Sequence, residues 1–275
     1  MNPHASPPTP PWAAVQTIWR HRQLVLQLSS REIRQRYRAS MLGVLWSLLT
    51  PLFMLAIYTL VFSGIFKARW AGQADTHGLF AVVLFVGTSL HGWMAEITTR
   101  TPGLIAEHTS YVKKVMFPLE VLPVVPLLAG LFQCLLNLGV LLAALCLLGG
   151  QLSWHVLQLP LVLAPFGLLL LGLAWLLAAA GVFLRDLSSI TTLATAGLMF
   201  LAPVFYPMEA APQSLQMWLR LNPLTFVIEQ TRRCLIWAQP LQWDGLLLYA
   251  VIAALVAWMG FVFFQKTRKG FADVL

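Results

Sequence analysis

The stretch REIRQRYRASMLGVLWSLLTP, residues 31–51, changes its solvent preference halfway along. Its first eight residues carry five charges, whereas residues 41–51 carry none. Arginine and lysine gather at the ends of membrane spans because the apolar interior of a bilayer disfavours charge. The stretch therefore predicts a membrane-spanning helix that begins just after a basic, water-facing segment.

The composition extends this prediction to the whole chain. Of the 275 residues, 59% are hydrophobic and only 10% are charged, whereas about a quarter of a typical soluble domain is charged. The mean hydropathy is +0.75. The net charge of +8 comes from basic residues beside apolar stretches, which indicates an anionic membrane surface and not nucleic acid. We expect an all-α integral membrane protein.

Six stretches approach the roughly 20 apolar residues that a spanning helix needs. They are residues 42–66, 79–97, 119–148, 157–184, 190–205 and 245–264. The fifth is short and ends in APVFYP, where Pro203 and Pro207 prevent a helix from continuing. We expect six spans, of which the fifth crosses incompletely or turns back.

Lysine and arginine are unevenly divided between the two sides of this arrangement. Six lie before the first span, three in the second loop, one in the fourth loop and three in the C-terminal tail, and the other five lie on the opposite side. The positive-inside rule then places both termini in the cytoplasm. We expect a disordered tail (1–11), interfacial helices (12–40), a transmembrane domain (41–265) and a cytoplasmic tail (266–275).

Two short helices are expected before the first span. Trp12, Val15, Ile18 and Trp19 recur at the spacing of one helix face, as in a helix that lies in the membrane interface.

The second of these helices is expected to start at a capping box formed by Ser29 and Glu32. On it, Arg31, Arg34 and Arg38 share one face. These arginines either only hold the first span in place, or also build a docking surface for another protein.

The sequence lacks the motifs of an energy-converting or catalytic centre. No glycine is followed by lysine, which excludes a P-loop, and neither GxSxG nor HExxH occurs. Glu96, Arg100 and Glu120 all lie at predicted span ends, so no carboxylate is expected deep in the bilayer. His91 is expected to be a hydrogen-bonded packing or pore residue. These features favour a conduit that is driven by another protein.

The second loop contains a short amphipathic pattern that Pro118 ends. One face carries Tyr111, Val112, Val115 and Met116, and another carries Lys113 and Lys114. An exposed apolar stripe usually has a partner, although an ordinary positive-inside loop is the alternative.

Residues 200–241 form the longest segment between two spans, and it holds two helix-length pieces, 211–221 and 223–237. Asn222-Pro223 between them is a helix start signal. Neither piece is long enough to span, so re-entrant or surface helices are expected. They form either a gate or a plain lid.

Four stretches together resemble the permease subunits of ABC-2 type polysaccharide exporters, the family of O-antigen, capsule and teichoic acid export permeases. They are REIRQRYRASMLGVLWSLLTPLFMLAIYTLVFSGIF, YVKKVMFPLEVLP, RDL followed by LAPVFYPMEAAP, and LNPLTFVIEQTRR, with a terminal GFADVL that the family also tends to show. They occur in order from Arg31 to Leu275.

The resemblance implies a homodimer in the bacterial inner membrane that moves a lipid-linked polysaccharide. It also implies that this chain holds no cofactor, because a separate cytoplasmic ABC ATPase binds ATP and magnesium. Arg31, Arg34, Arg38 and residues 111–116 would contact that ATPase. Pro203, Tyr206, Pro207, Asn222 and Pro223 would belong to an outer gate.

Aromatic side chains would guide sugars in such a channel, and Trp46, Tyr58 and Trp93 are the candidates. The sequence departs from the family around His91 and Gly92, where a more aromatic stretch is expected.

Two alternative functions are an ABC-2 permease for lipids or drugs and a membrane-embedded glycosyl or lipid-phosphate transferase. The transferase would need paired acidic residues, whereas no two acidic residues here lie within five positions of each other.

Overall fold

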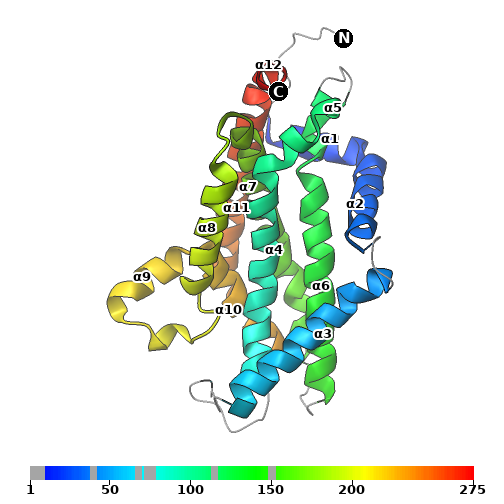
Figure 1. Ribbon diagram of the computed structural model, residues 1–275. Coiled ribbons are helices and arrows are strands. Elements are labelled where there is room, and N and C mark those ends of the chain that lie inside the picture. The colour runs from blue at the N-terminus through cyan, green and yellow to red at the C-terminus, as the bar shows by residue number, and fades with distance from the viewer. Residues whose placement is uncertain (1–9, 38–41, 66–69, 71–78, 113–116, 148–152) are drawn as a thin grey trace.

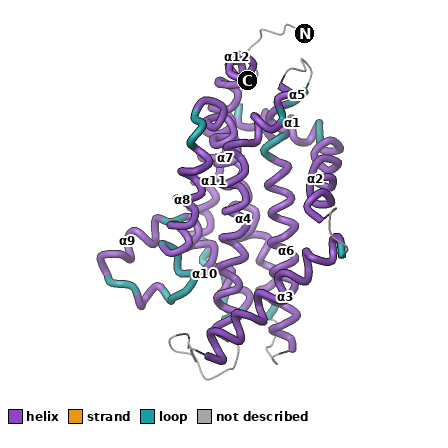
Figure 2. The backbone as a smooth tube through the Cα atoms, in the orientation of Figure 1, coloured by secondary structure: helices purple, strands orange, loops and turns teal. Residues whose placement is uncertain are grey.

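The computed structural model describes residues 10–37, 42–65, 70, 79–112, 117–147 and 153–275. Throughout these ranges the regular structure is helical, with no β-strand (Figure 2). In a bilayer, a helix satisfies its own backbone hydrogen bonds, so runs of apolar residues adopt this form.

Within the described ranges, five helical stretches are long and apolar enough to cross a membrane. Each corresponds to one of the predicted spans. They are Trp46–Ile65 (α3, Trp46–Tyr58, continued by a π-helical turn), Leu79–Glu107 (α4), Leu119–Leu147 (containing α6, Val124–Leu147), Trp154–Phe183 (containing α7, Leu159–Phe183) and Trp243–Val274 (α11, Trp243–Thr267, and α12, Phe271–Val274).

The fifth predicted span is a shorter helix, α8 (Leu187–Phe200). Its 14 residues extend about 21 Å at 1.5 Å per residue, less than the roughly 30 Å of a hydrocarbon core. The chain then turns and continues through α9 (Gln213–Leu221) and α10 (Pro223–Leu235). In Figure 1, α9 projects sideways from the bundle.

The second span is longer than predicted, because α4 continues past Ile97 to Glu107. Glu96 and Arg100, predicted to lie at the end of this span, are therefore both inside the helix. They are tolerated there because α2 supplies charged partners, as described below.

The core is built around α4. Of the most apolar 18-residue part of α4, 72% is buried, against 11% for α3. Helix α4 packs against α6, α7 and α8. The most extensive helix contact joins α7 to α11, and it needs glycine at Gly260, where an added Cβ would collide with the carbonyl oxygen of Gly172.

Figure 1 shows that the bundle has two distinct ends. Helices α1 (Pro11–Arg20), α5 (Thr109–Val112) and α12 lie at one end, which we call the terminal end. Helix α3 ends and α4 begins at the opposite end, which we call the far end.

The two predicted N-terminal helices are present as α1 and α2 (Arg22–Tyr37). Trp12 and Trp19 of α1 are exposed, as expected of a helix that rests on a membrane surface. The predicted capping box is wrong, because the helices separate at His21. Ser29 instead lies inside α2 and is buried.

Candidate functional site

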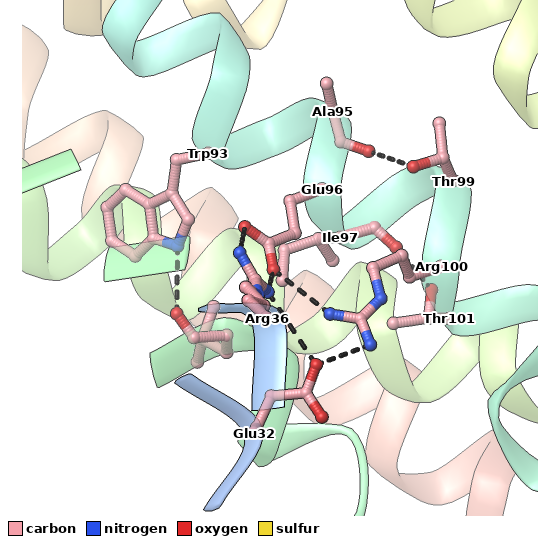
Figure 3. Close-up of polar contacts among 10 residues, drawn as sticks. Glu32, Arg36, Trp93, Ala95, Glu96, Ile97, Thr99, Arg100 and Thr101 are labelled. Atoms are coloured by element: carbon pink, nitrogen blue, oxygen red, sulfur yellow. Dashed lines mark hydrogen bonds and ion pairs between the residues drawn. The ribbon is translucent and has the colours of Figure 1, made fainter. Parts of the chain in front are cut away.

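An ion-pair cluster joins α2 to α4, and Figure 3 shows its members. Arg36 pairs with both carboxylate oxygens of Glu96, with 3.1 Å between Nη1 and Oε2. Arg100 reaches Glu32 over 2.5 Å (Nη2 to Oε1) and Glu96 over 3.4 Å (Nη1 to Oε1). The two arginines and two glutamates therefore alternate, and each charge faces an opposite one.

Burial makes this cluster more consequential than an ordinary surface ion pair. The side chain of Glu96 is only 13% exposed, so water screens its charge less than it would at the surface. Removing one member would leave a partly buried charge without its partner, which is costly. The cluster thus fastens the N-terminal helix α2 to the most buried span.

The outer face of α2 carries two of the three predicted docking arginines. Arg31 and Arg34 are exposed, and they border a broad open hollow. Arg34 also donates a hydrogen bond to the hydroxyl of Ser30, at 3.0 Å. Arg38 lies outside the described residues. Arg36 was not predicted as a site residue, although its i,i+4 spacing from Glu32 was visible in the sequence.

The second loop begins with the short helix α5, which holds Tyr111 and Val112. The ring of Tyr111 stacks on Phe117, with 4.4 Å between centroids, and on His108, with 5.6 Å. Lys113, Lys114, Val115 and Met116 lie outside the described residues. Tyr111 and Val112 are both partly buried against the core.

The chain's C-terminal segment holds the other side of this loop. Arg268 donates to the carboxylate of Glu120 over 2.8 Å and to the carbonyl of Phe117 over 3.1 Å. The indole of Trp175 on α7 donates to the backbone carbonyl of Glu120. Two separate sets of charge contacts therefore hold the N- and C-terminal segments to the rest of the chain, one between α2 and α4 and one between Arg268 and Glu120.

On the far-end side, Asn222 fixes the junction between α9 and α10. Its side-chain oxygen caps α10 by accepting from the Leu224 amide, and its amide nitrogen donates to the carbonyls of Leu198 and Leu201. Pro223 occupies the first turn of α10. The predicted helix start at Asn222-Pro223 is confirmed.

The turn after α8 contains the other predicted gate residues. Tyr206 donates from its hydroxyl to the carbonyl of Phe200 at 2.7 Å, which folds the turn back onto α8. Pro203 is buried and Pro207 is half-buried. Their roles in a gate stay predictions.

Arg232 of α10 is the residue that the sequence reasoning missed, because it was counted only as one of the five basic residues on the side opposite the termini. It is 3% exposed. Its guanidinium donates to the carbonyls of Val83, Pro203 and Val204 at 2.6 to 3.1 Å. One side chain thus joins α10, the start of α4 and the turn after α8.

The three candidate channel aromatics have different surroundings. Trp46 is exposed at the start of α3 and Tyr58 is half-buried beside Phe85. Trp93 is 3% exposed, and its indole donates to the carbonyl of Leu127. The burial of Trp93 gives no support to a channel role, which stays a prediction for all three. His91, as expected, is hydrogen-bonded: its ring lies 3.0 Å from the carbonyl of Thr195.

Comparison with known proteins adds independent information. The chain is 26% identical to the O-antigen export system permease protein RfbA of Myxococcus xanthus over 94% of this chain and 98% of that protein. It is 25% identical to the O-antigen export system permease protein RfbA of Klebsiella pneumoniae over 92% of this chain and 95% of that protein. The family profile described as ABC-2 type transporter matches residues 23–236. Because this match covers most of the chain, including α2, α4 and α10, the protein belongs to the ABC-2 type transporter family.

Proposed function

We propose that this chain is the membrane-spanning subunit of an ATP-driven exporter that moves a lipid-linked polysaccharide across the inner membrane of a bacterium. Two copies would form the conduit, and a separate cytoplasmic ABC ATPase would bind ATP and magnesium. The observation that carries the proposal is the near full-length similarity to O-antigen export permeases. The sequence also lacks a P-loop, which supports a separate ATPase as the source of energy.

We place the terminal end in the cytoplasm, where the ATPase would dock. The exposed arginines Arg31 and Arg34 and the loop that starts at Tyr111 lie on the two elements that the resemblance assigns to this contact. The ion-pair cluster supports this role, because a force on α2 would pass directly to α4 through Arg36 and Glu96.

We place the outer gate in the segment from Pro203 to Pro223. A gate must be held in one position and still be separable from the spans. Hydrogen bonds from Asn222 and Tyr206 to the last turn of α8 supply such a hold, and these bonds can break and re-form.

The test is deletion of this chain in the cell that makes it, followed by analysis of its glycans. We expect surface polysaccharide to disappear and the lipid-linked polymer to accumulate inside, since synthesis would continue without export. Restoring the chain together with its ATPase should reverse both effects. Restoring it with an ATPase whose P-loop lysine is replaced should not.

The alternatives make different predictions for the same strain. A permease for drugs or small lipids would leave surface polysaccharide unchanged and alter efflux of those compounds. A transferase would abolish the polymer itself, so none would accumulate inside. Either result would overturn the proposal.

A further inference from the structure

A cavity of about 280 Å³ opens beside α10, between Trp70 and the turn after α8. We call it the α10 cavity. Its lining combines aromatic, amide and charged side chains. Among them are Trp70, Trp237, Glu209, Glu229, Arg233 and Gln239. None of the roles described above accounts for this combination.

The floor of the α10 cavity is rigid. Arg232 lies there, held by its bonds to the carbonyls of Val83, Pro203 and Val204. The ring of Trp70 stacks over its guanidinium, with 4.7 Å from Cζ to the ring centroid. A binding site built on locked side chains loses little conformational entropy when a ligand enters.

One wall is equally fixed. The side chain of Gln230 donates to the side-chain oxygen of Gln242 and accepts from the backbone amide of Gln242, both at 2.9 Å. Arg233 uses its Nε to bond the carbonyl of Pro240, at 3.1 Å. Within the described residues its Nη atoms have no hydrogen-bond or ion-pair partner, so they remain as donors at the cavity.

The lining chemistry selects against most ligand classes. A purely apolar ligand would cover the carboxylates of Glu209 and Glu229 and the Nη atoms of Arg233 without offering them hydrogen bonds, which is costly. An anion would meet the carboxylates of Glu209 and Glu229. A cation would meet Arg232 and Arg233.

A neutral sugar ring suits this mixed lining better. Its hydroxyls both donate and accept hydrogen bonds, which suits amides, carboxylates and guanidinium groups together. Its C–H faces can pack on the rings of Trp70 and Trp237. The volume lies just below the roughly 300 Å³ at which pockets for drug-sized ligands begin, which fits one or two sugar rings and not a long segment.

We propose that the α10 cavity is a saccharide subsite that binds one or two neutral sugar residues of the transported polymer. The inference rests on the proposed export function and adds a location to it. Pro203 and Pro207 line the same cavity, so a sugar bound there contacts the segment assigned to the gate. The subsite thus holds the chain where the gate opens, and weak binding lets it move on.

The experiment uses the full chain purified with its ATPase in lipid nanodiscs. The probes are short oligosaccharides cut from the surface polymer of the producing cell, with their lipid removed. Binding is measured by saturation-transfer NMR and calorimetry. We expect Trp237→Ala to weaken binding at least tenfold and Trp237→Phe to weaken it less, because phenylalanine keeps a ring face.

Two further variants keep the result interpretable. Gln239→Ala changes an exposed lining residue and should weaken binding without affecting folding. Trp154→Ala removes an 85% exposed tryptophan that does not line the cavity, and should bind as the wild type does. If Trp237→Ala and Gln239→Ala both bind like the wild type, or if the wild type binds none of the oligosaccharides, the subsite is refuted.

That failure is distinguishable from failure of the export function. Export is read separately, as surface polymer in cells that carry each variant. Wild-type export without oligosaccharide binding overturns the subsite alone. No dependence of surface polymer on this chain overturns both.

Discussion

At the scale of single residues, the guanidinium of Arg232 is the most consequential polar group in the described structure. A buried cation normally needs a carboxylate, but this one is satisfied by three backbone carbonyls and the face of Trp70. Only arginine offers a planar fork that reaches several acceptors at once. Lysine has one nitrogen at the end of its chain and cannot serve the same three carbonyls.

Arg232→Lys should therefore lower the free energy of unfolding by roughly 2 kcal/mol, since it leaves buried carbonyls without donors. Thermal denaturation of the detergent-solubilised protein measures this change. The matched control is Arg233→Lys, which alters the neighbouring, half-exposed arginine and should stay within about 0.5 kcal/mol. Equal stability of the two variants would contradict the central role of Arg232.

At the scale of elements, α2 packs against α6, whereas charged side chains make its link to α4. The cluster of Glu32, Arg36, Glu96 and Arg100 alternates in sign, so reversing one charge converts an attraction into a repulsion. Reversing one charge should thus break the contact, and reversing its partner as well should restore it in part.

Arg36→Glu should release α2 from α4 and speed hydrogen exchange of the α2 amides at least tenfold. The double variant Arg36→Glu with Glu96→Arg should restore part of the protection. Restoration stays partial because the introduced glutamate would lie four residues from Glu32, and the introduced arginine four residues from Arg100, so each meets a like charge on its own helix. If the single variant exchanges like the wild type, the cluster does not hold α2.

At the scale of the whole molecule, α1 and α12 lie at one end of the bundle and α9 and α10 lie away from it (Figure 1). If the terminal end faces the cytoplasm, Arg34 lies nearer the cytoplasm than Tyr206 does, because α2 meets α4 at Glu96, whereas the turn that holds Tyr206 meets α4 at Gly87, closer to the far end.

This arrangement is tested with single cysteines, after Cys134, Cys146 and Cys234 are replaced. Tyr206→Cys should react with a membrane-impermeant maleimide added to intact spheroplasts. Arg34→Cys should react only after the membrane is broken. A bifunctional maleimide should also join two copies through position 206 and stop export, if the gates of two chains meet. The reverse labelling pattern would overturn the orientation.

The long spans could be predicted from the sequence because their signal is local: an apolar run of sufficient length specifies a helix. What could not be predicted depends on partners far away in the chain. The ion pair of Glu96 was not predicted, since its partner Arg36 lies 60 residues earlier. The burial of Arg232 was not predicted, since its acceptor, the carbonyl of Val83, lies 149 residues earlier. The start of α10 was predictable because Asn222 caps its own helix.

The same separation has a consequence for how the protein is made. The carbonyl of Val83 and the guanidinium of Arg232 are 149 residues apart. At a synthesis rate of roughly 5 to 20 residues per second, about 7 to 30 s pass between the emergence of the two groups from the ribosome. During that interval the start of α4 is already in the membrane, but the hydrogen bonds from Arg232 to Val83 have not yet formed. The machinery that inserts the nascent chain, or the lipids around it, must occupy that place until α10 arrives.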